Sequence, residues 1–183
     1  MGALGYDALL ATANALARDQ RWEDALRVLD EHPALVEGSF DLSWNAGWWE
    51  YKLERFEEAL VPLRRAIALA PDKPLGHWAL GVVLAELGKM DEAAAEYREA
   101  LRLRDSFLAR RSLGLVLMDL GRLDEAEAVF REGLALQPHH RERVVGLADF
   151  LFDIGRKDEA EVLYRHAERL PTREERGKTP RPR

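Results

Sequence analysis

The chain has 183 residues, of which 47% are hydrophobic, which is enough for one folded domain or one short repeat array with an apolar interior. Charged residues make up 33% and the net charge is −6, so the basic excess that binds a phosphate backbone is missing and nucleic acid is not an expected partner. The absence of cysteine excludes disulfides, thiolate metal sites, cysteine nucleophiles and lipid attachment through cysteine.

We expect no targeting signal in the N-terminal stretch, residues 1–18. It has no basic flank before its apolar residues, and no segment of the chain reaches the roughly 18 uninterrupted apolar residues of a membrane span. We therefore expect a soluble, cytoplasmic protein that does not act on a membrane.

A repeat of about 34 residues then runs along the chain. Each copy contains an alanine that directly follows two acidic residues, and successive alanines are 34, 34, 33 and 34 residues apart. These alanines are Ala25, Ala59, Ala93, Ala126 and Ala160. Four residues after each alanine stands a large side chain, namely Leu29, Leu63, Tyr97, Phe130 or Tyr164. The period predicts five stacked copies, at about residues 6–39, 40–73, 74–106, 107–140 and 141–174.

Each copy predicts two amphipathic helices joined by a tight turn. Gly88, Gly121 and Gly155 separate the two helical runs in the last three copies, where glycine supplies a left-handed turn. The acidic pairs fall in the first turn of the second helix and complement the positive end of its dipole. One hairpin cannot bury both of its faces, so neighbouring hairpins must share a continuous core.

Both ends of the chain and the first two copies depart from the regular pattern. His32-Pro33 is expected to cut the second helix of copy one short, as suits a terminal cap. Pro62 falls inside the second helix of copy two, where it removes a hydrogen bond, and we expect it on the solvent side. Residues 1–5 are expected to form a lead-in, and residues 175–183, which contain no apolar side chain, a disordered tail.

This pattern closely resembles the tetratricopeptide repeat (TPR) family. The matching residues are the Leu-Gly pairs Leu80-Gly81 and Leu113-Gly114, then the alanine, the aromatic residue four positions later and, in copy four, Pro138. The resemblance spans about residues 6–174. It implies an all-α, right-handed superhelical α-solenoid of stacked antiparallel helix hairpins, whose first helices line a concave groove.

No group of residues predicts catalysis. The five histidines are scattered, and His139-His140 with Glu142 nearby is interpreted as an ordinary solvated loop, because adjacent loop histidines seldom converge on a metal. Phosphate-cradling loops, a dinucleotide fingerprint on a strand and a nucleophile elbow do not occur. We therefore expect no enzyme activity, no cofactor and no metal site.

Aromatic residues gather in the first helices of copies two and three. Trp44, Trp48 and Tyr51 are spaced i, i+4 and i+7 and so share one face of a helix. A second stripe on that helix is formed by Leu42, Ala46, Trp49 and Leu53. The family resemblance places the first stripe and its equivalents in the groove. The candidate partner-binding residues are Trp44, Trp48, Tyr51, Trp78, Val82, Arg111, Leu115, Met118, Asp149 and Phe152.

Two interpretations of these aromatic residues stay open. Tryptophan and tyrosine anchor many protein interfaces, and two apolar stripes on one helix exceed what the stack itself buries. Alternatively, the rings fill a narrow superhelix by packing against each other, as stripes of aromatics at helical spacing often do.

Some family members hold a peptide's terminal carboxylate with basic and asparagine side chains. Asn14 and Asn45 resemble two of those asparagines, but Leu10, Leu75 and Ala79 stand where positive charge would be needed. Too little positive charge remains to offset the desolvation of a carboxylate, so this mode of binding is not expected.

The sequence therefore predicts a module that binds a peptide or helix of a partner protein in an apolar, aromatic-lined groove. One alternative is a structural adaptor that self-associates through the C-terminal repeat, where Val162, Leu163 and Leu170 lack a covering helix. Another is a regulatory or docking subunit of a larger enzyme complex.

Overall fold

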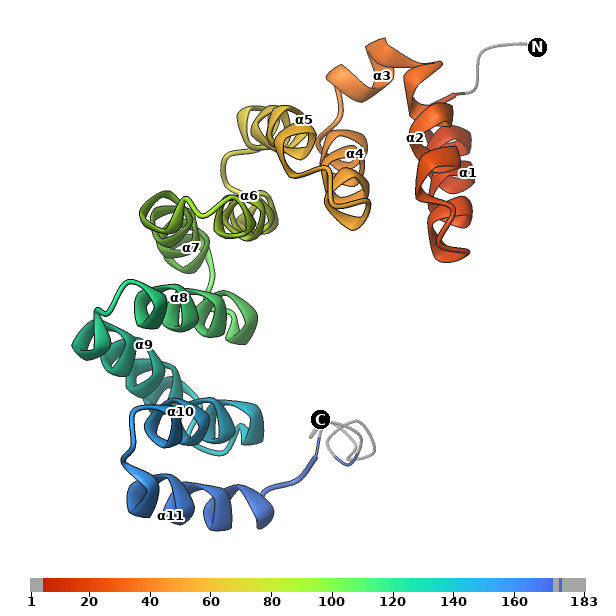
Figure 1. Ribbon diagram of the computed structural model, residues 1–183. Coiled ribbons are helices and arrows are strands. Elements are labelled where there is room, and N and C mark those ends of the chain that lie inside the picture. Colours follow the sequence, from red (N-terminus) through yellow and green to blue (C-terminus); the bar gives the residue numbers. More distant parts are fainter. Residues whose placement is uncertain (1–4, 173–174, 176–183) are drawn as a thin grey trace. The chain divides into compact units, whose positions relative to one another are not determined.

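The computed structural model describes residues 5–172 and residue 175, and these form eleven α-helices without a β-strand (Figure 1). The expected all-α fold of helix hairpins is confirmed. The chain divides into two units, Met1–Asp105 and Ser106–Arg183. Residues 1–4 of the expected lead-in, and the expected disordered tail apart from Glu175, lie outside the described residues.

Unit 1 contains three helix hairpins and one short extra helix. α1 packs against α2, α4 against α5, and α6 against α7. The helices are α1 (Tyr6–Arg18), α2 (Trp22–Asp30), α3 (Pro33–Glu37), α4 (Phe40–Lys52), α5 (Phe56–Leu69), α6 (Pro74–Glu86) and α7 (Met90–Leu103). As expected, α2 ends just before His32-Pro33, after nine residues, whereas α5 and α7 have 14 residues each. α3 then leads into α4.

Unit 2 contains two helix hairpins, α8 with α9 and α10 with α11, which meet where α9 packs against α10. Their bounds are α8 (Phe107–Asp119), α9 (Leu123–Leu136), α10 (Arg141–Asp153) and α11 (Lys157–Glu168). Within the described residues of both units, no helix is both long and apolar enough to cross a membrane.

The repeated alanines mark the closest approach of paired helices. All five have no exposed surface. In copies three and four the Leu-Gly pair on the facing helix makes room for the aromatic side chain four residues after the alanine. A Cβ on Gly81 would lie 2.7 Å from Tyr97 Cε1, and a Cβ on Gly114 would overlap the ring of Phe130. The Ala, Gly and aromatic positions of the repeat are therefore one packing contact, used in both units.

The turn inside each hairpin uses one residue with a left-handed backbone. Gly88, Gly121 and Gly155 have φ values of 73°, 71° and 87°. In the first two hairpins the same position holds Gln20 and Glu54, with φ values of 60° and 59°. Residues with a Cβ rarely adopt this conformation. The turns of copies one and two are therefore strained relative to the glycine turns of the later copies.

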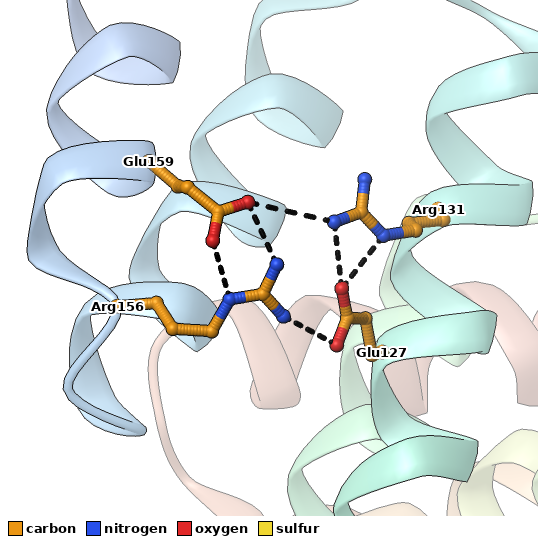
Figure 2. Close-up of polar contacts among 4 residues, drawn as sticks. All are labelled: Glu127, Arg131, Arg156 and Glu159. Carbon is orange, nitrogen blue, oxygen red and sulfur yellow. Dashed lines mark hydrogen bonds and ion pairs between the residues drawn. The ribbon is translucent and has the colours of Figure 1, made fainter.

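Four charged residues connect α9 to α11 in unit 2 (Figure 2). Arg156 lies just before α11, and its guanidinium donates to Glu127 Oε2 on α9 at 2.7 Å and to Glu159 at 2.6 and 2.7 Å. Arg131 donates to Glu127 Oε1 at 2.7 Å, and its Nη2 lies 3.9 Å from Glu159 Oε2. Each carboxylate therefore meets both arginines, and the network ties the second helices of successive hairpins together.

Pro62, which was expected on the solvent side, is partly exposed. It is half-buried within α5, which continues as one helix through it, and it lines a hollow beside α2 and α3. The lining residues of this hollow come from the short α2, from α3, and from α4 and α5.

Candidate functional site

The candidate residues of unit 1 form a stack of aromatic rings, here named the aromatic cluster: Trp44, Trp48 and Tyr51 of α4 and Trp78 of α6. Trp48 lies at the centre. Its ring centroid is 5.6 Å from Trp44, 4.8 Å from Tyr51 and 5.3 Å from Trp78. These separations are typical of favourable aromatic pairs. All four side chains, like Val82 on α6, are half-buried, whereas Trp49 of the second stripe is only 3% exposed.

Polar atoms at the edge of the aromatic cluster determine what it can contact. The Nζ atom of Lys52 lies 5.1 Å from the Trp48 ring and 5.3 Å from the Tyr51 ring, within cation–π distance. Burial, and then the charge of Glu86, raise the pKa of Tyr51, so its hydroxyl stays neutral. The indole Nε1 atoms of Trp44 and Trp78 are buried and meet no hydrogen-bond acceptor among the described residues. An oxygen that reached either indole would relieve the cost of an unpaired donor.

Asn14 and Asn45 bond each other. Asn45 Nδ2 on α4 donates to Asn14 Oδ1 on α1 at 3.1 Å, and the Asn45 side chain is buried. Their pairing joins the first two hairpins. The two amides are thus used in packing, in line with the expectation that no carboxylate clamp operates here.

The candidate residues of unit 2 line one hollow of about 300 Å³, here named the α8–α10 hollow. Arg111, Leu115 and Met118 reach it from α8, and Asp149 and Phe152 from α10. Phe130, Gly146, Phe150, Asp153 and Tyr164 complete its lining. Leu115 is 39% exposed and Phe152 48% exposed, so two large apolar side chains stand open to solvent at the hollow. The hollow therefore has accessible apolar surface beside charged side chains.

Tyr164, the large residue four positions after Ala160, also lines this hollow and was not among the candidate binding residues. Its hydroxyl donates to Asp149 Oδ1 at 2.7 Å. Burial, this hydrogen bond and the charges of Asp149 and Asp153 raise the pKa of Tyr164 to about 12, so it is a neutral donor that orients Asp149. One feature of the sequence distinguishes this hairpin: Ala148 stands where copies three and four have glycine. In copies three and four the glycine lies directly against the aromatic ring, whereas Tyr164 is half-buried and lines the hollow.

A second hollow of about 280 Å³ adjoins the first and shares Arg111, Gly146 and Asp149 with it. Its other lining residues are Phe107, Arg141, Glu142, Val145 and Thr172. Its charged lining residues include both arginines and carboxylates. The inner faces of α8 and α10 therefore offer apolar area with charged groups of defined position, an arrangement suited to recognising a peptide.

His139 and His140 lie in the connection from α9 to α10. His140 Nδ1 lies 2.9 Å from Glu142 Oε2, and no three His, Asp or Glu side chains converge on one point within the described part of the chain.

The ten candidate residues thus form two sets. Trp44, Trp48, Tyr51, Trp78 and Val82 lie on α4 and α6 of unit 1. Arg111, Leu115, Met118, Asp149 and Phe152 lie on α8 and α10 of unit 2. Each set is brought together within its own unit.

Several solved structures share this fold. Pseudomonas aeruginosa pilF is 18% identical with a TM-score of 0.74, covering 92% of this chain and 77% of its own. MamA is 16% identical with a TM-score of 0.73, covering 85% of this chain and 92% of its own. YrrB, described as a TPR protein with an unusual peptide-binding site, is 22% identical with a TM-score of 0.68, covering 89% and 84%. No curated protein sequence matches the chain.

Two stretches of the sequence, residues 45–106 and 117–172, match family models of the tetratricopeptide repeat. Together they cover more than half of the chain. The first contains the complete contact of Ala93, Gly81 and Tyr97, and the second contains Ala126 and Phe130. The fold, the packing contact and the sequence matches agree: the chain belongs to the tetratricopeptide repeat family, whose members are typically non-catalytic modules of protein–protein interaction.

Proposed function

We propose that the chain binds a peptide or helical segment of a partner protein on the inner faces of its first helices. The observation that carries this proposal is the α8–α10 hollow, in which Leu115 and Phe152 remain open to solvent beside Asp149. Burying two large apolar side chains against a partner yields a few kcal/mol of favourable free energy. A folded chain gains nothing from exposing them without such a partner.

The charges at the hollow favour a partner segment that carries both apolar and basic side chains. Asp149 and Asp153 line the hollow, with Arg111 as the one basic residue there. Tyr164 holds Asp149 by a hydrogen bond, so a cation can meet this carboxylate at little cost in side-chain entropy. An apolar side chain would enter beside Leu115 and Met118.

The aromatic cluster is proposed as the contact area of unit 1. Its half-buried rings present flat apolar surface, and Trp44 and Trp78 hold indole donors without acceptors among the described residues. Tryptophan is enriched among residues that dominate binding energy. YrrB, a TPR protein described as having a peptide-binding site, supports the view that this fold can hold a peptide.

A peptide-display selection on the full chain, followed by calorimetry on the selected peptides, tests this proposal. The variant is Leu115→Ser and its matched control is Leu108→Ser, because both leucines are exposed on α8 but only Leu115 lines the hollow. We expect Leu115→Ser to weaken binding by about tenfold, as loss of an interface anchor does, and Leu108→Ser to change it by less than about twofold. Equal effects of the two substitutions would contradict the proposed site.

Self-association is a second candidate, favoured by one observation. Val162 on α11 is 65% exposed, and Leu163 and Leu170 are half-buried near it. A second copy that covered this face would bury apolar area left open at the last hairpin. Light scattering over micromolar concentrations tests this function: a strictly monomeric chain would rule it out, and a dimer that Val162→Ser dissociates would support it.

A further inference from the structure

A third hollow, of about 310 Å³, lies entirely within unit 1, between α2, α3, α4 and α5. We name it the α2–α5 hollow. None of the ten candidate binding residues lines it, and it is formed mainly by second helices of the hairpins. It is therefore separate from the surfaces of the proposed function.

The walls of this hollow are apolar. Val61 of α5 is 63% exposed, and Pro62 beside it is half-buried. Leu29 and Val36 form the opposite wall from α2 and α3, at 2% and 8% exposure. An aliphatic chain that entered here would pack against all four, and the exposed area of Val61 would be buried.

Hydrogen-bond acceptors surround these walls. The carboxylates of Glu37, Glu50 and Glu58 line the hollow from α3, α4 and α5, together with Asp30 at the end of α2. The single basic lining residue, Arg65, lies 3.9 Å from Glu37. Among the described lining residues four are acidic and one is basic, and Arg55, which does not line the hollow, lies 3.6 Å from Glu50.

The backbone adds to this acceptor character. Pro62 has no N–H, so the helical hydrogen bond that would end at the Glu58 carbonyl is not made. Both residues line the hollow.

We propose that the α2–α5 hollow docks a partner-protein segment that presents an arginine or lysine beside an apolar side chain. The apolar side chain and the methylenes of the basic residue pack on Val61, Pro62 and Leu29. The cationic head reaches the carboxylates of Glu50 and Glu58. Long basic side chains commonly bind in this way, with an apolar stem and a charged end. A purely apolar ligand would leave the carboxylates desolvated and unpaired, and an acidic one would be repelled.

The state of Glu50 agrees with this assignment. Burial raises the pKa of Glu50 despite the nearby Arg55 guanidinium, and the charges of Glu58 and Asp30 raise it further. Its Oε2 atom is buried without a hydrogen bond, and the closest cationic nitrogen, Arg55 Nη1, is 3.6 Å away. A cation that entered the hollow would stabilise this carboxylate.

Methyl NMR on the full chain tests the proposal with three synthetic peptides that share the frame acetyl-Gly-Leu-X-Leu-Gly-amide. X is arginine, its neutral analogue citrulline, or glutamate. We expect the arginine peptide to shift the methyl signals of Val61 and Leu29. The citrulline peptide should bind there about five- to tenfold more weakly, because it loses the charge-assisted contacts, and the glutamate peptide should cause no shift.

Matched variants separate the hollow from the overall negative charge of the protein. Glu57 and Glu58 are adjacent exposed residues in the first turn of α5, but only Glu58 lines the hollow. Glu58→Gln should weaken binding of the arginine peptide about two- to fivefold, and Glu57→Gln should leave it nearly unchanged. Val61→Ser should weaken it about fivefold, whereas Val162→Ser on α11, equally exposed in the other unit, should not.

Three results would overturn the assignment: Val61 and Leu29 signals that stay fixed at millimolar arginine peptide, equal binding of the citrulline peptide, or equal effects of Glu57→Gln and Glu58→Gln. The outcome is independent of the proposed function. A peptide on the α8–α10 hollow would shift the methyl signals of Leu115 and Met118 instead.

Discussion

The inner faces of the first helices differ sharply between the two units. In unit 1 they carry Trp44, Trp48 and Trp78, which are half-buried; the Trp48 ring stacks on Trp44 and packs at a tilt against Trp78. In unit 2 the matching positions carry smaller or charged side chains such as Leu115 and Asp149, and a hollow of about 300 Å³ remains between α8 and α10. The large aromatic rings of unit 1 therefore cover part of one another's apolar surface. The smaller side chains of unit 2 leave a hollow that a partner could enter.

The first prediction concerns the contact that both units share. Gly114→Ala in unit 2 should lower the free energy of unfolding by about 3 kcal/mol, because the added Cβ overlaps the Phe130 ring inside a packed hairpin. Gly81→Ala in unit 1, where the Cβ would meet Tyr97 at 2.7 Å, should have a similar effect. Chemical denaturation measures both. Gly38→Ala is the control, because its Cβ would lie 3.4 Å from its nearest neighbour, an ordinary contact.

The second prediction concerns the difference between the two faces. Trp48→Ala should lower the free energy of unfolding by about 2 kcal/mol, since it removes a half-buried ring that stacks on three others. Leu115→Ala, at an exposed position of the hollow, should cost less than about 0.5 kcal/mol. Thermal unfolding distinguishes them without a known partner. A loss of about 3–5 kcal/mol at Trp48 would indicate a residue that only packs, and a negligible loss one that serves binding alone.

The third prediction uses the ion-pair network of unit 2 (Figure 2). Burial alone would raise the pKa of Glu127, but hydrogen bonds from Arg131 and Arg156 outweigh it and hold the pKa below its usual 4.5. A lowered folded-state pKa stabilises the protein above pH 4.5, and this stabilisation is lost as the pH falls through the folded-state value. Glu127→Gln should therefore lower the melting temperature by about 2 °C at neutral pH, and by less as the solution is acidified below about pH 4.

Glu161→Gln is the control for this network, because Glu161 pairs only within α11, with Arg165. In unit 1 the corresponding link between hairpins is the pair of Arg55 with Glu23 at 2.7 Å, which lacks the second arginine. If Glu23→Gln destabilised the protein more than Glu127→Gln, the network would not be the stronger of the two links.

The smallest effect is expected at the tight turns, which also differ between the units. Glu54→Gly should raise the free energy of unfolding by about 0.5–1 kcal/mol, because glycine adopts the left-handed conformation at φ 59° without strain. Gly121→Glu in unit 2 should lower the free energy of unfolding by a similar amount, because a residue with a Cβ would then have to adopt φ 71°. Chemical denaturation would measure both changes, provided that the slope of the unfolding free energy against denaturant concentration stays the same. A loss of stability in Glu54→Gly would show that the Glu54 side chain makes a contact worth more than the backbone strain.

The sequence by itself was sufficient for the helices and for how they pair. The alanines, the Leu-Gly pairs and the aromatic residues recur with a period of 33 or 34 residues, and each describes a contact between two helices that are neighbours along the chain. Such contacts depend on local spacing, so the periodicity predicts them. The early end of α2 at His32-Pro33 and the glycine turns were predicted for the same reason.

Tertiary structure alone decided which side chains fill their surroundings and which leave space. Helical spacing assigns a residue to a face, but whether that face is open depends on side chains from other helices. Trp48 packs on Trp78 across two helices, and Asn45 bonds Asn14 on α1. Tyr164 bonds Asp149 of another helix, and Pro62 of α5 lines a hollow together with residues of α2, α3 and α4. Each of these results depends on the volume and donors contributed by a second helix, which a pattern along one helix does not contain.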